Sequence, residues 1–203
     1  MTKKYKKKIL YCHGLFKFEK MLLSEKNHIK AIKALDNNDE VNIISKTIIN
    51  SIKQGNKILI CGNGGSAADS NHIAAEFVGR FEKNRNPLSA ISLSSNVALI
   101  TAIANDFGFK YIFSRQIEGL GNHGDVLIAL STSGRSENIA EAIKMSLSKG
   151  INVIFITGNH DLRIKEKNIS LLKIKSKNTA TIQEAYMYLL HNIIRNMENE
   201  FIF

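Results

Sequence analysis

The sequence predicts an α/β protein with a doubly wound, mostly parallel β-sheet that is flanked by helices. Three observations support this fold class. Short apolar runs, which are typical of buried strands, alternate with segments in which apolar residues recur at helical spacing. Glycines mark the ends of several of these segments. Strands that are apolar throughout and separated by helices are typical of parallel sheets whose two faces are both covered.

The predicted elements follow one another in a regular order. Helical spacing predicts helices over about residues 21–35, 39–54, 67–81, 97–104, 110–120, 137–149 and 179–200. Apolar runs predict strands over about residues 57–61, 88–93, 125–130, 152–158 and 169–174. Gly55, Gly121 and Gly150 each follow a predicted helix, a position that glycine often takes because it accepts the left-handed conformation. With no repeat or low-complexity linker in the sequence, we expect a single domain over residues 21–203.

Residues 1–20 are predicted to be a basic N-terminal extension. They carry seven lysines and one glutamate, which is +6 of the chain's net charge of +10. The remaining charge is ordinary for the surface of a domain. Since no basic stretch is interleaved with aromatic residues and no nucleic-acid-binding motif is present, we do not expect nucleic acid as a partner.

The sequence also argues against a membrane partner. No apolar stretch approaches the roughly 20 residues that a membrane-spanning helix needs. The apolar segment after the first lysines is short, contains His13 and has no small-residue cleavage pattern. We therefore expect a cytoplasmic location. Cys12 and Cys61 are too few for a disulfide framework, and we expect Cys61 to act as a small apolar residue in a buried strand.

A glycine-rich turn at residues 61–66 joins a predicted strand to a predicted helix. Glycines there allow positive φ and a close approach of the backbone to a ligand, while the free N–H groups and positive end of the helix attract an anion. The turn lacks the G-x-G-x-x-G spacing of a dinucleotide site, and the chain has no G-x-x-x-x-G-K-[ST] motif. The turn therefore predicts a cradle for a small phosphorylated metabolite.

A second turn of the same kind follows the strand predicted at 125–130. Ser131, Thr132, Ser133 and Ser136 supply hydroxyl donors around Gly134, just before another helix. Glycine-rich turns follow many strands without binding anything, but ligands of parallel sheets lie beyond the carboxyl ends of the strands, where both turns are expected. Two such turns together favour a phosphorylated ligand.

Candidates for acid–base chemistry lie on two of the predicted helices. His72 and Glu76 are four residues apart, so their side chains are neighbours on one helix face. Gln183 and His191 are eight residues apart on the last helix, about 12 Å of axial rise, and converge only if both side chains lean inward. The pair at 72 and 76 could act as acid and base, bind a metal, or be a simple surface contact. His191 could equally be a hydrogen-bonded residue on a packed helix.

Three stretches of this sequence together resemble the phosphoheptose isomerases of the sugar-isomerase (SIS) domain superfamily. They read CGNGGSAADSNHIAAEFVGRF, AIANDFGFKYIFSRQIEGLGNHGDVLIALSTSGRSENI and TATIQEAYMYLLH, and the similarity extends from about residue 21 to 200. The resemblance implies a doubly wound α/β domain that assembles as a homotetramer with active sites near subunit boundaries. It also implies conversion of sedoheptulose 7-phosphate to D-glycero-D-manno-heptose 7-phosphate, the first step toward nucleotide-activated heptose for surface polysaccharide.

The resemblance also assigns roles by position. It implies substrate contacts at Asn63, Gly64, Gly65, Ser66, Glu76, Asn105, Asp106, Ser131, Thr132, Ser133, Ser136 and Gln183. It implies one zinc ion per subunit, held by His72, Glu76, Gln183 and His191. Glu76 and His191 would be the catalytic proton-transfer pair. A ketose–aldose conversion needs such a pair, because a base must take a proton from C1 and an acid must return one to C2.

The sequence departs from the family pattern in its last motif and leaves two other functions open. Family members usually carry an arginine where this chain has Thr181, and residues 160–177 are rich in lysine and match poorly. One relative of these isomerases is a non-catalytic partner of a replication initiator and lacks the catalytic glutamate and histidine, both of which are present here. The third possibility is an isomerase of another phosphoketose.

Overall fold

Five strands form a parallel sheet in the order β2-β1-β3-β4-β5 in the computed structural model, which describes residues 25–36, 38–162, 164, 166 and 168–201. Every neighbouring pair of these strands is parallel. The strands are β1 (Ile58–Gly62), β2 (Ala90–Ser92), β3 (Val126–Ser131), β4 (Asn152–Gly158) and β5 (Ser170–Ile174). This arrangement confirms the fold class that the sequence predicts.

Helices connect the strands and cover both faces of the sheet. Residues 25–33 are helical. The other helices are α2 (Asp39–Lys53), α3 (Gly65–Val78), α4 (Val97–Phe107), a 3₁₀ turn at Phe109–Tyr111, α5 (Ser114–Leu120), α6 (Glu137–Ser148) and α7 (Thr179–Glu198). Asparagine side chains cap three of these helices by accepting a hydrogen bond from a first-turn N–H group: Asn38 for α2, Asn96 for α4 and Asn178 for α7.

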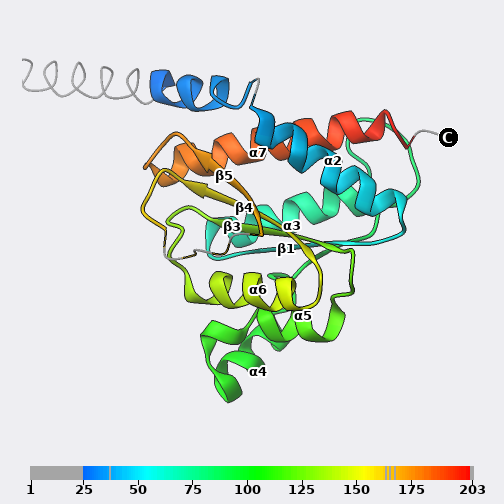
Figure 1. Cartoon of the computed structure of the whole chain (residues 1–203), viewed down its shortest axis with the longest axis vertical. Helices are drawn as coiled ribbons and strands as arrows, with labels where there is room; N and C mark the ends of the chain where they lie inside the picture. Colours follow the sequence, from blue (N-terminus) through cyan, green and yellow to red (C-terminus); the bar gives the residue numbers. More distant parts are fainter. Residues whose placement is uncertain (1–24, 37, 163, 165, 167, 202–203) are drawn as a thin grey trace, which may run out of the picture.

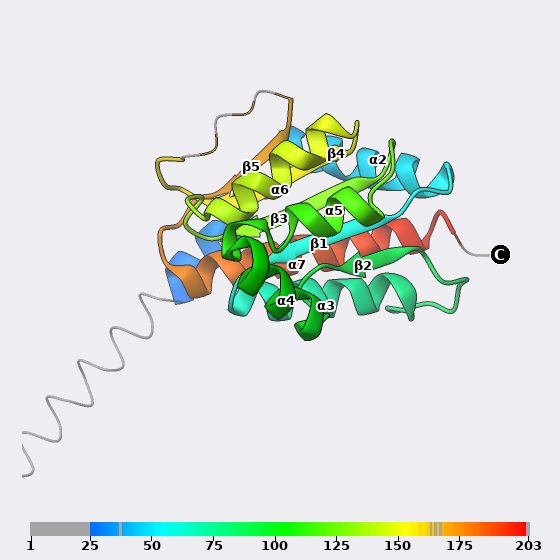
Figure 2. The same ribbon diagram turned by 90° about the horizontal axis from the view of Figure 1, so that it is seen from below.

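The two faces of the sheet carry different helices and separate cores. Helices α2, α3 and α7 pack on one face, and α4, α5 and α6 lie on the other (Figures 1 and 2). Because successive side chains of a strand point to opposite faces, Ile58 and Ile60 of β1 enter the first core, whereas Leu59 and Cys61 enter the second. The thiol of Cys61 is thus a buried core group, as expected from the sequence.

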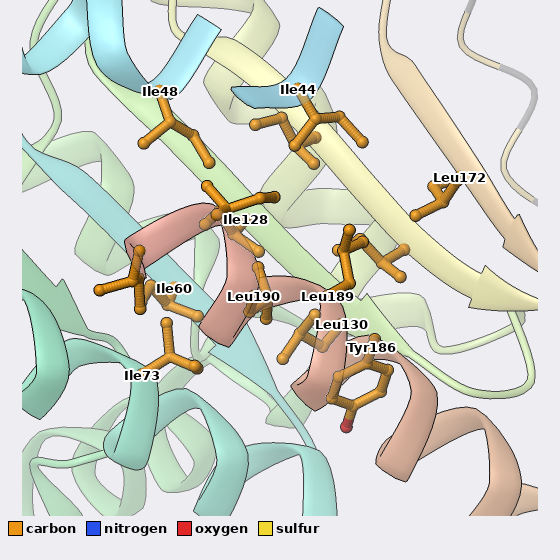
Figure 3. Packing of buried hydrophobic residues seen from close by; sticks show 14 of the residues in the cluster. Ile44, Ile48, Ile60, Ile73, Ile128, Leu130, Leu172, Tyr186, Leu189 and Leu190 are labelled. Carbon is orange, nitrogen blue, oxygen red and sulfur yellow. The ribbon is translucent and has the colours of Figure 1, made fainter. Parts of the chain in front are cut away.

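The first core surrounds α7, whose buried side chains meet those of the strands and of α2 and α3. Figure 3 shows this packing around Ile44, Ile48, Ile60, Ile73, Ile128, Leu130, Leu172, Tyr186, Leu189 and Leu190. All of these side chains are buried. Each fully buried aliphatic side chain contributes about 2 kcal/mol of hydrophobic stabilisation, so this layer holds α3 and α7 in a fixed register on the sheet.

The strand order reverses its direction between β1 and β3. The chain passes from β1 outward to β2 and returns to β3 on the other side of β1, so the direction of winding reverses there. Gly62 at the end of β1 is paired in register with Leu130 near the end of β3. Ligands of such sheets bind beyond the carboxyl ends of the strands at this reversal. Both predicted anion-binding turns are located there.

Several predicted boundaries differ from the structure: the helix predicted over 97–104 continues to Phe107, and the strand predicted over 88–93 covers only Ala90–Ser92. The helix predicted over residues 67–81 begins at Gly65 and ends at Val78, because Glu198 binds the backbone N–H groups that follow Gly79. The helix predicted over residues 110–120 is split into the 3₁₀ turn and α5. Gly108, with φ of +99°, starts a turn with a shorter hydrogen-bond repeat before the chain enters α5.

Two further expectations concern the N-terminal extension and the absence of a membrane-spanning helix. The predicted extension at residues 1–20, with Cys12 and His13, lies outside the described residues. Among the residues that the structure does describe, no helix has both the length and the apolar character needed to cross a membrane.

Candidate active site

The turn between β1 and α3 depends on glycine at three positions, 62, 64 and 65. Gly64 has φ of +56°, a left-handed conformation that side chains other than glycine rarely adopt. A Cβ atom at Gly62 would collide with the backbone of Ser66, and one at Gly65 would collide with the side-chain amide of Gln183. Gly62 and Gly65 are therefore packed too tightly for larger residues, and the turn leads directly into the free N–H groups at the start of α3.

The turn after β3 is joined to this first turn by a pair of amides. Asn63 and Asn138 donate to each other through their side chains, at 2.9 and 2.8 Å. Within the second turn, Ser131 Oγ lies 3.2 Å from Ser136 Oγ, which immediately precedes α6. The structure thus brings both sequence-predicted turns, including Thr132 and Ser133, to one end of the sheet, where two helices begin.

Helix α7 begins at the same end and runs alongside α3. Gln183 packs against Gly65 at the start of α3, and the buried Tyr186 hydroxyl donates to the carboxylate of Asp69 while lying 3.0 Å from Ser66 Oγ. Burial and the neighbouring Asp69 raise the pKa of Tyr186 above its usual value, so the hydroxyl keeps its proton. Figure 2 shows the two helices running in the same direction.

Further along these two helices, His72, Glu76 and His191 come together. Their nitrogen and oxygen ligand atoms all lie within 4.8 Å of one another. His72 Nε2 is 3.0 Å from Glu76 Oε1, and the ring centroids of His72 and His191 are 5.1 Å apart. The register that places Gln183 beside Gly65 therefore places His191 beside the pair at 72 and 76, which the sequence alone left open.

The imidazole of His191 stacks on an aromatic ring and has a buried nitrogen without a hydrogen-bond partner among the described residues. The ring of Phe81 stacks on it, with centroids 5.1 Å apart and an interplanar angle of 14°. Its Nε2 atom is buried and has no hydrogen-bond partner among the described residues. Burial, followed by the charge of nearby His72, lowers the pKa of His191 below its ordinary value, although Glu76 opposes the shift. The ring is therefore neutral at pH 7, with a nitrogen available to a proton or a metal.

The cradle and the His–Glu–His cluster are separate parts of the site. His72 lies seven residues after Gly65, and Glu76 lies eleven residues after Gly65. These separations correspond to about 10 and 16 Å of rise along α3. The contact that Gln183 makes is at the cradle end. A hollow of about 780 Å³ between residues 25–32 and α7 extends to His191, so the cluster opens to the surface on that side.

Asn105 and Asp106 lie away from both parts of the site within one chain. They are exposed at the end of α4 and hydrogen-bonded to each other at 2.8 Å. Helix α4 projects farther from the sheet than the other helices on its face (Figure 1). Asp106 lines a separate hollow of about 320 Å³ between α4 and α5. One chain therefore does not gather every residue that the sequence assigns to substrate binding.

Several residues that shape the site were not found by sequence reasoning. Tyr186, Asp69 and Asn138 support the cradle through partners that are remote in the sequence. Ser94, after β2, donates to the carbonyl of Gly62 at 3.0 Å. No local pattern marks such contacts, because they depend on the register between helices. Thr181 is buried in the first turn of α7, where its N–H group donates to the Asn178 side chain.

Comparison with known proteins shows the protein family to which the chain belongs. The model of the SIS domain family matches residues 14–158, a range that includes both turns and all of α3. Among curated relatives, the phosphoheptose isomerase of Campylobacter concisus (strain 13826) is 44% identical over 154 residues, which cover 76% of this chain and 82% of the relative. The chain belongs to the SIS domain family and, within it, to the phosphoheptose isomerases.

Solved structures agree with this assignment. A phosphoheptose isomerase from Francisella tularensis has a TM-score of 0.84 and 31% identity, and the match covers 90% of this chain and 98% of that one. The phosphoheptose isomerase of Neisseria gonorrhoeae has a TM-score of 0.81 and 33% identity, covering 89% and 98%. At these coverages both matches extend beyond residue 158, where the match to the family model ends.

Proposed function

We propose that this aldose–ketose isomerase converts sedoheptulose 7-phosphate to D-glycero-D-manno-heptose 7-phosphate. The observation that carries the proposal is the proximity of Glu76 to His191, whose ligand atoms lie within 4.8 Å of each other. The buried Nε2 of His191 has no hydrogen-bond partner among the described residues. The pair lies on two helices that meet at the anion cradle, where Gln183 of α7 contacts Gly65 of α3. The names of the curated relatives and solved structures support the choice of a heptose phosphate.

The chemistry requires two proton movements along the C1–C2 bond. A base removes a proton from C1 of the ketose while the C2 oxygen gains one, which gives an enediol. Return of a proton to C2 and loss of the proton from the C1 oxygen complete the aldose. We propose that Glu76 and His191 share these transfers. A neutral imidazole with a free nitrogen can exchange a proton with a sugar oxygen, and the carboxylate can act as a base.

The turns after β1 and β3 would hold the phosphate and the polar carbons. Asn63, Gly64 and Gly65 present backbone N–H groups and an amide, and Ser131 and Ser136 present hydroxyls. A heptose 7-phosphate carries its reactive carbons and its phosphate at opposite ends of the carbon chain. A site whose cradle and proton-transfer pair lie apart suits such an elongated substrate. Fixing the far end contributes to rate by proximity and orientation.

We also propose a zinc site at the cluster. Two imidazoles and one carboxylate with an open fourth position are the donor set of many catalytic zinc sites, and His72, Glu76 and His191 provide it. The unpartnered Nε2 of His191 fits this assignment, and while it held zinc it would not exchange a proton with the substrate. When bound, zinc supplies Lewis-acid polarisation of the sugar oxygens, worth several kcal/mol. Because Gln183 contacts Gly65, we assign its amide to substrate binding and leave the fourth position to water or substrate.

We propose that the chain acts as a homotetramer in which neighbours complete each site. Apolar side chains on and after α4 are exposed in the single chain, including Val97, Phe107 and Phe109, which are 70, 50 and 59% exposed. Such a patch is typical of an interface. Asn105 and Asp106 lie at its end, so a neighbouring copy could place them in a site that one chain leaves incomplete. The product would enter heptose synthesis for surface polysaccharide.

The proposal is tested by a coupled assay across several ketose phosphates with purified, metal-loaded protein. We expect turnover of sedoheptulose 7-phosphate, and we expect Glu76→Gln and His191→Gln each to lower kcat by about two orders of magnitude or more without loss of fold. Circular dichroism checks the fold. Turnover of a different ketose phosphate would redefine the substrate.

Two outcomes would contradict parts of this proposal. Absence of turnover with every ketose phosphate would favour a non-catalytic binding protein of the same family. Full activity after complete removal of zinc would confine the metal to an accessory role. Metal analysis of protein prepared without chelator measures occupancy independently of activity.

A further inference from the structure

A buried ion pair joins the ends of α3 and α7, next to the candidate proton-transfer residues. Arg85 Nε lies 3.2 Å from Glu198 Oε1, and both side chains are completely buried. Glu198 is the last residue of α7, and Arg85 lies in the segment between α3 and β2. Neither residue belongs to the cradle or to the His–Glu–His cluster.

The carboxylate of Glu198 organises the turn that follows α3. Its oxygens accept the backbone N–H groups of Phe81, Glu82 and Lys83 at 3.0, 2.9 and 3.1 Å. Together with Arg85, these are four donors on one carboxylate. Three consecutive backbone groups bound to one buried carboxylate fix the position of the turn relative to α7.

The guanidinium of Arg85 holds the last turn of α3 in the same way. It donates to the carbonyl of Phe77 at 2.8 Å and to the carbonyl of Glu76. A third bond reaches the carbonyl of Asn86 at 3.2 Å. The planar fork of arginine suits this multiple recognition, which lysine could not reproduce. One end of the ion pair is therefore bonded to the backbone of Glu76 itself.

The other end of the pair controls what covers His191. Glu198 binds the N–H group of Phe81, and the Phe81 ring stacks on the His191 imidazole. The two proton-transfer residues are thus each one contact away from this buried pair, through the Glu76 carbonyl and through Phe81. Because Glu76 and His191 lie on different helices, their relative position depends on how the helix ends are joined.

We propose that Arg85 and Glu198 are positioning residues that set the geometry of Glu76 and His191, with Phe81 as the contact that orients the imidazole. The inference deepens the proposed isomerase function and rests on it for its kinetic consequence. Buried ion pairs often add little net stability compared with apolar residues. In this position the pair instead fixes three backbone N–H groups and three carbonyls at the site.

The kinetic test uses Glu198→Gln, which preserves the shape of the side chain but replaces one acceptor oxygen by an amide that faces N–H groups. We expect kcat to fall by about tenfold or more, since small displacements of reacting groups are costly. We expect KM to stay within about twofold, because the cradle lies more than one helical turn away. A smaller folded fraction would also lower the apparent kcat at constant KM, so kcat is divided by the folded fraction that circular dichroism measures, and the position of His191 is read independently.

A spectroscopic test reads the position of His191 directly. An aromatic ring stacked on the imidazole shifts the ring-proton NMR signals of His191 upfield, and the spectrum of His191→Gln identifies those signals by their absence. We expect the upfield shift to decrease in Glu198→Gln and to disappear in Phe81→Leu. Phe81→Leu leaves the ion pair intact and should lower kcat in the same direction, so it also serves if Glu198→Gln does not fold.

The matched control is Glu200→Gln. Glu200 pairs with Lys53 at 2.7 Å, and both side chains are about half exposed, so the variant removes a carboxylate near the same end of the chain without touching the turn. We expect the wild-type kcat, and we expect the ring-proton NMR signals of His191 to stay at their wild-type positions. Wild-type kcat in Glu198→Gln or Phe81→Leu, or an unchanged His191 signal in either, would overturn the proposal. If wild-type protein turns over no ketose phosphate, the proposed function fails, and the NMR shift still decides the positioning role.

Discussion

Gly65 is the residue at which the cradle meets α7. Its φ is ordinary, so the requirement for glycine comes from space, because a Cβ atom would collide with the side-chain amide of Gln183. We expect Gly65→Ala to displace this amide and to raise KM for the sugar phosphate by about tenfold, the size of a lost hydrogen bond to a charged ligand. Steady-state kinetics measure the change.

The control for this substitution is Gly119→Ala. Gly119 lies within α5, and nothing is within 4 Å of the position that its Cβ would occupy. Alanine is the better helix former, so the variant should keep its KM and gain about 0.5–1 kcal/mol of stability at most. An unchanged KM in Gly65→Ala would show that the cradle tolerates the movement of Gln183.

At the scale of residues, the sequence predicts those site residues whose role is local. The turns at 61–66 and 131–136 are recognisable because glycines, hydroxyls and helix starts occur together in a few positions. The pair of His72 and Glu76 is recognisable from helical spacing alone. The contributions of Asp69 and Glu198 are not, because their partners lie more than 100 residues away in the sequence.

At the scale of elements, the parallel pairing of α3 and α7 builds most of the site. Tyr186 joins the two helices through Asp69 and Ser66, and its side chain is completely buried. We expect Tyr186→Phe to lower the free energy of unfolding by about 1–2 kcal/mol, because the hydroxyl is lost and the Asp69 carboxylate loses a donor. Denaturant titration measures the loss.

Tyr188→Phe provides the comparison, since Tyr188 lies on the same helix but is 44% exposed. We expect its stability to remain within about 0.5 kcal/mol of the wild type. Equal losses in the two variants would mean that the buried hydroxyl contributes nothing specific. A loss in Tyr186→Phe together with a weaker binding of inorganic phosphate would place the hydroxyl in support of the cradle.

The order and type of the elements were predictable from apolar periodicity, whereas some boundaries were not. The end of α3 was placed three residues too late, because its apolar spacing continues to Phe81 while tertiary bonds from Glu198 redirect the chain. The segment at 110–120 has helical spacing throughout, yet its hydrogen-bond pattern changes between the 3₁₀ turn and α5. At the end of α3 a contact with a distant residue overrides local propensity, whereas the 3₁₀ turn follows the positive φ of Gly108.

At the scale of the whole molecule, the two parts of the site and the exposed end of α4 raise the question of assembly. Within one chain, His72, Glu76 and His191 meet, but Asn105 and Asp106 lie on a helix that projects from the opposite face of the sheet (Figure 1). Sequence reasoning could name these residues but could not place them in a site, since under the proposed assembly their position would depend on how copies pack. The proposed sharing of a site between copies would account for both observations.

Mixing two inactive variants tests this arrangement. If Asp106 of one copy serves the site that holds Glu76 of another, Asp106→Ala and Glu76→Gln homotetramers are each inactive. Co-folded mixtures would then contain sites with both native residues, and random pairing in an equal mixture would restore about a quarter of the wild-type activity. Glu76→Gln mixed with His191→Gln is the matched control. Because Glu76 and His191 come from the same chain, no combination restores an intact pair, and we expect no recovery. Recovery in the control but not in the first mixture would reverse the assignment of residues to copies.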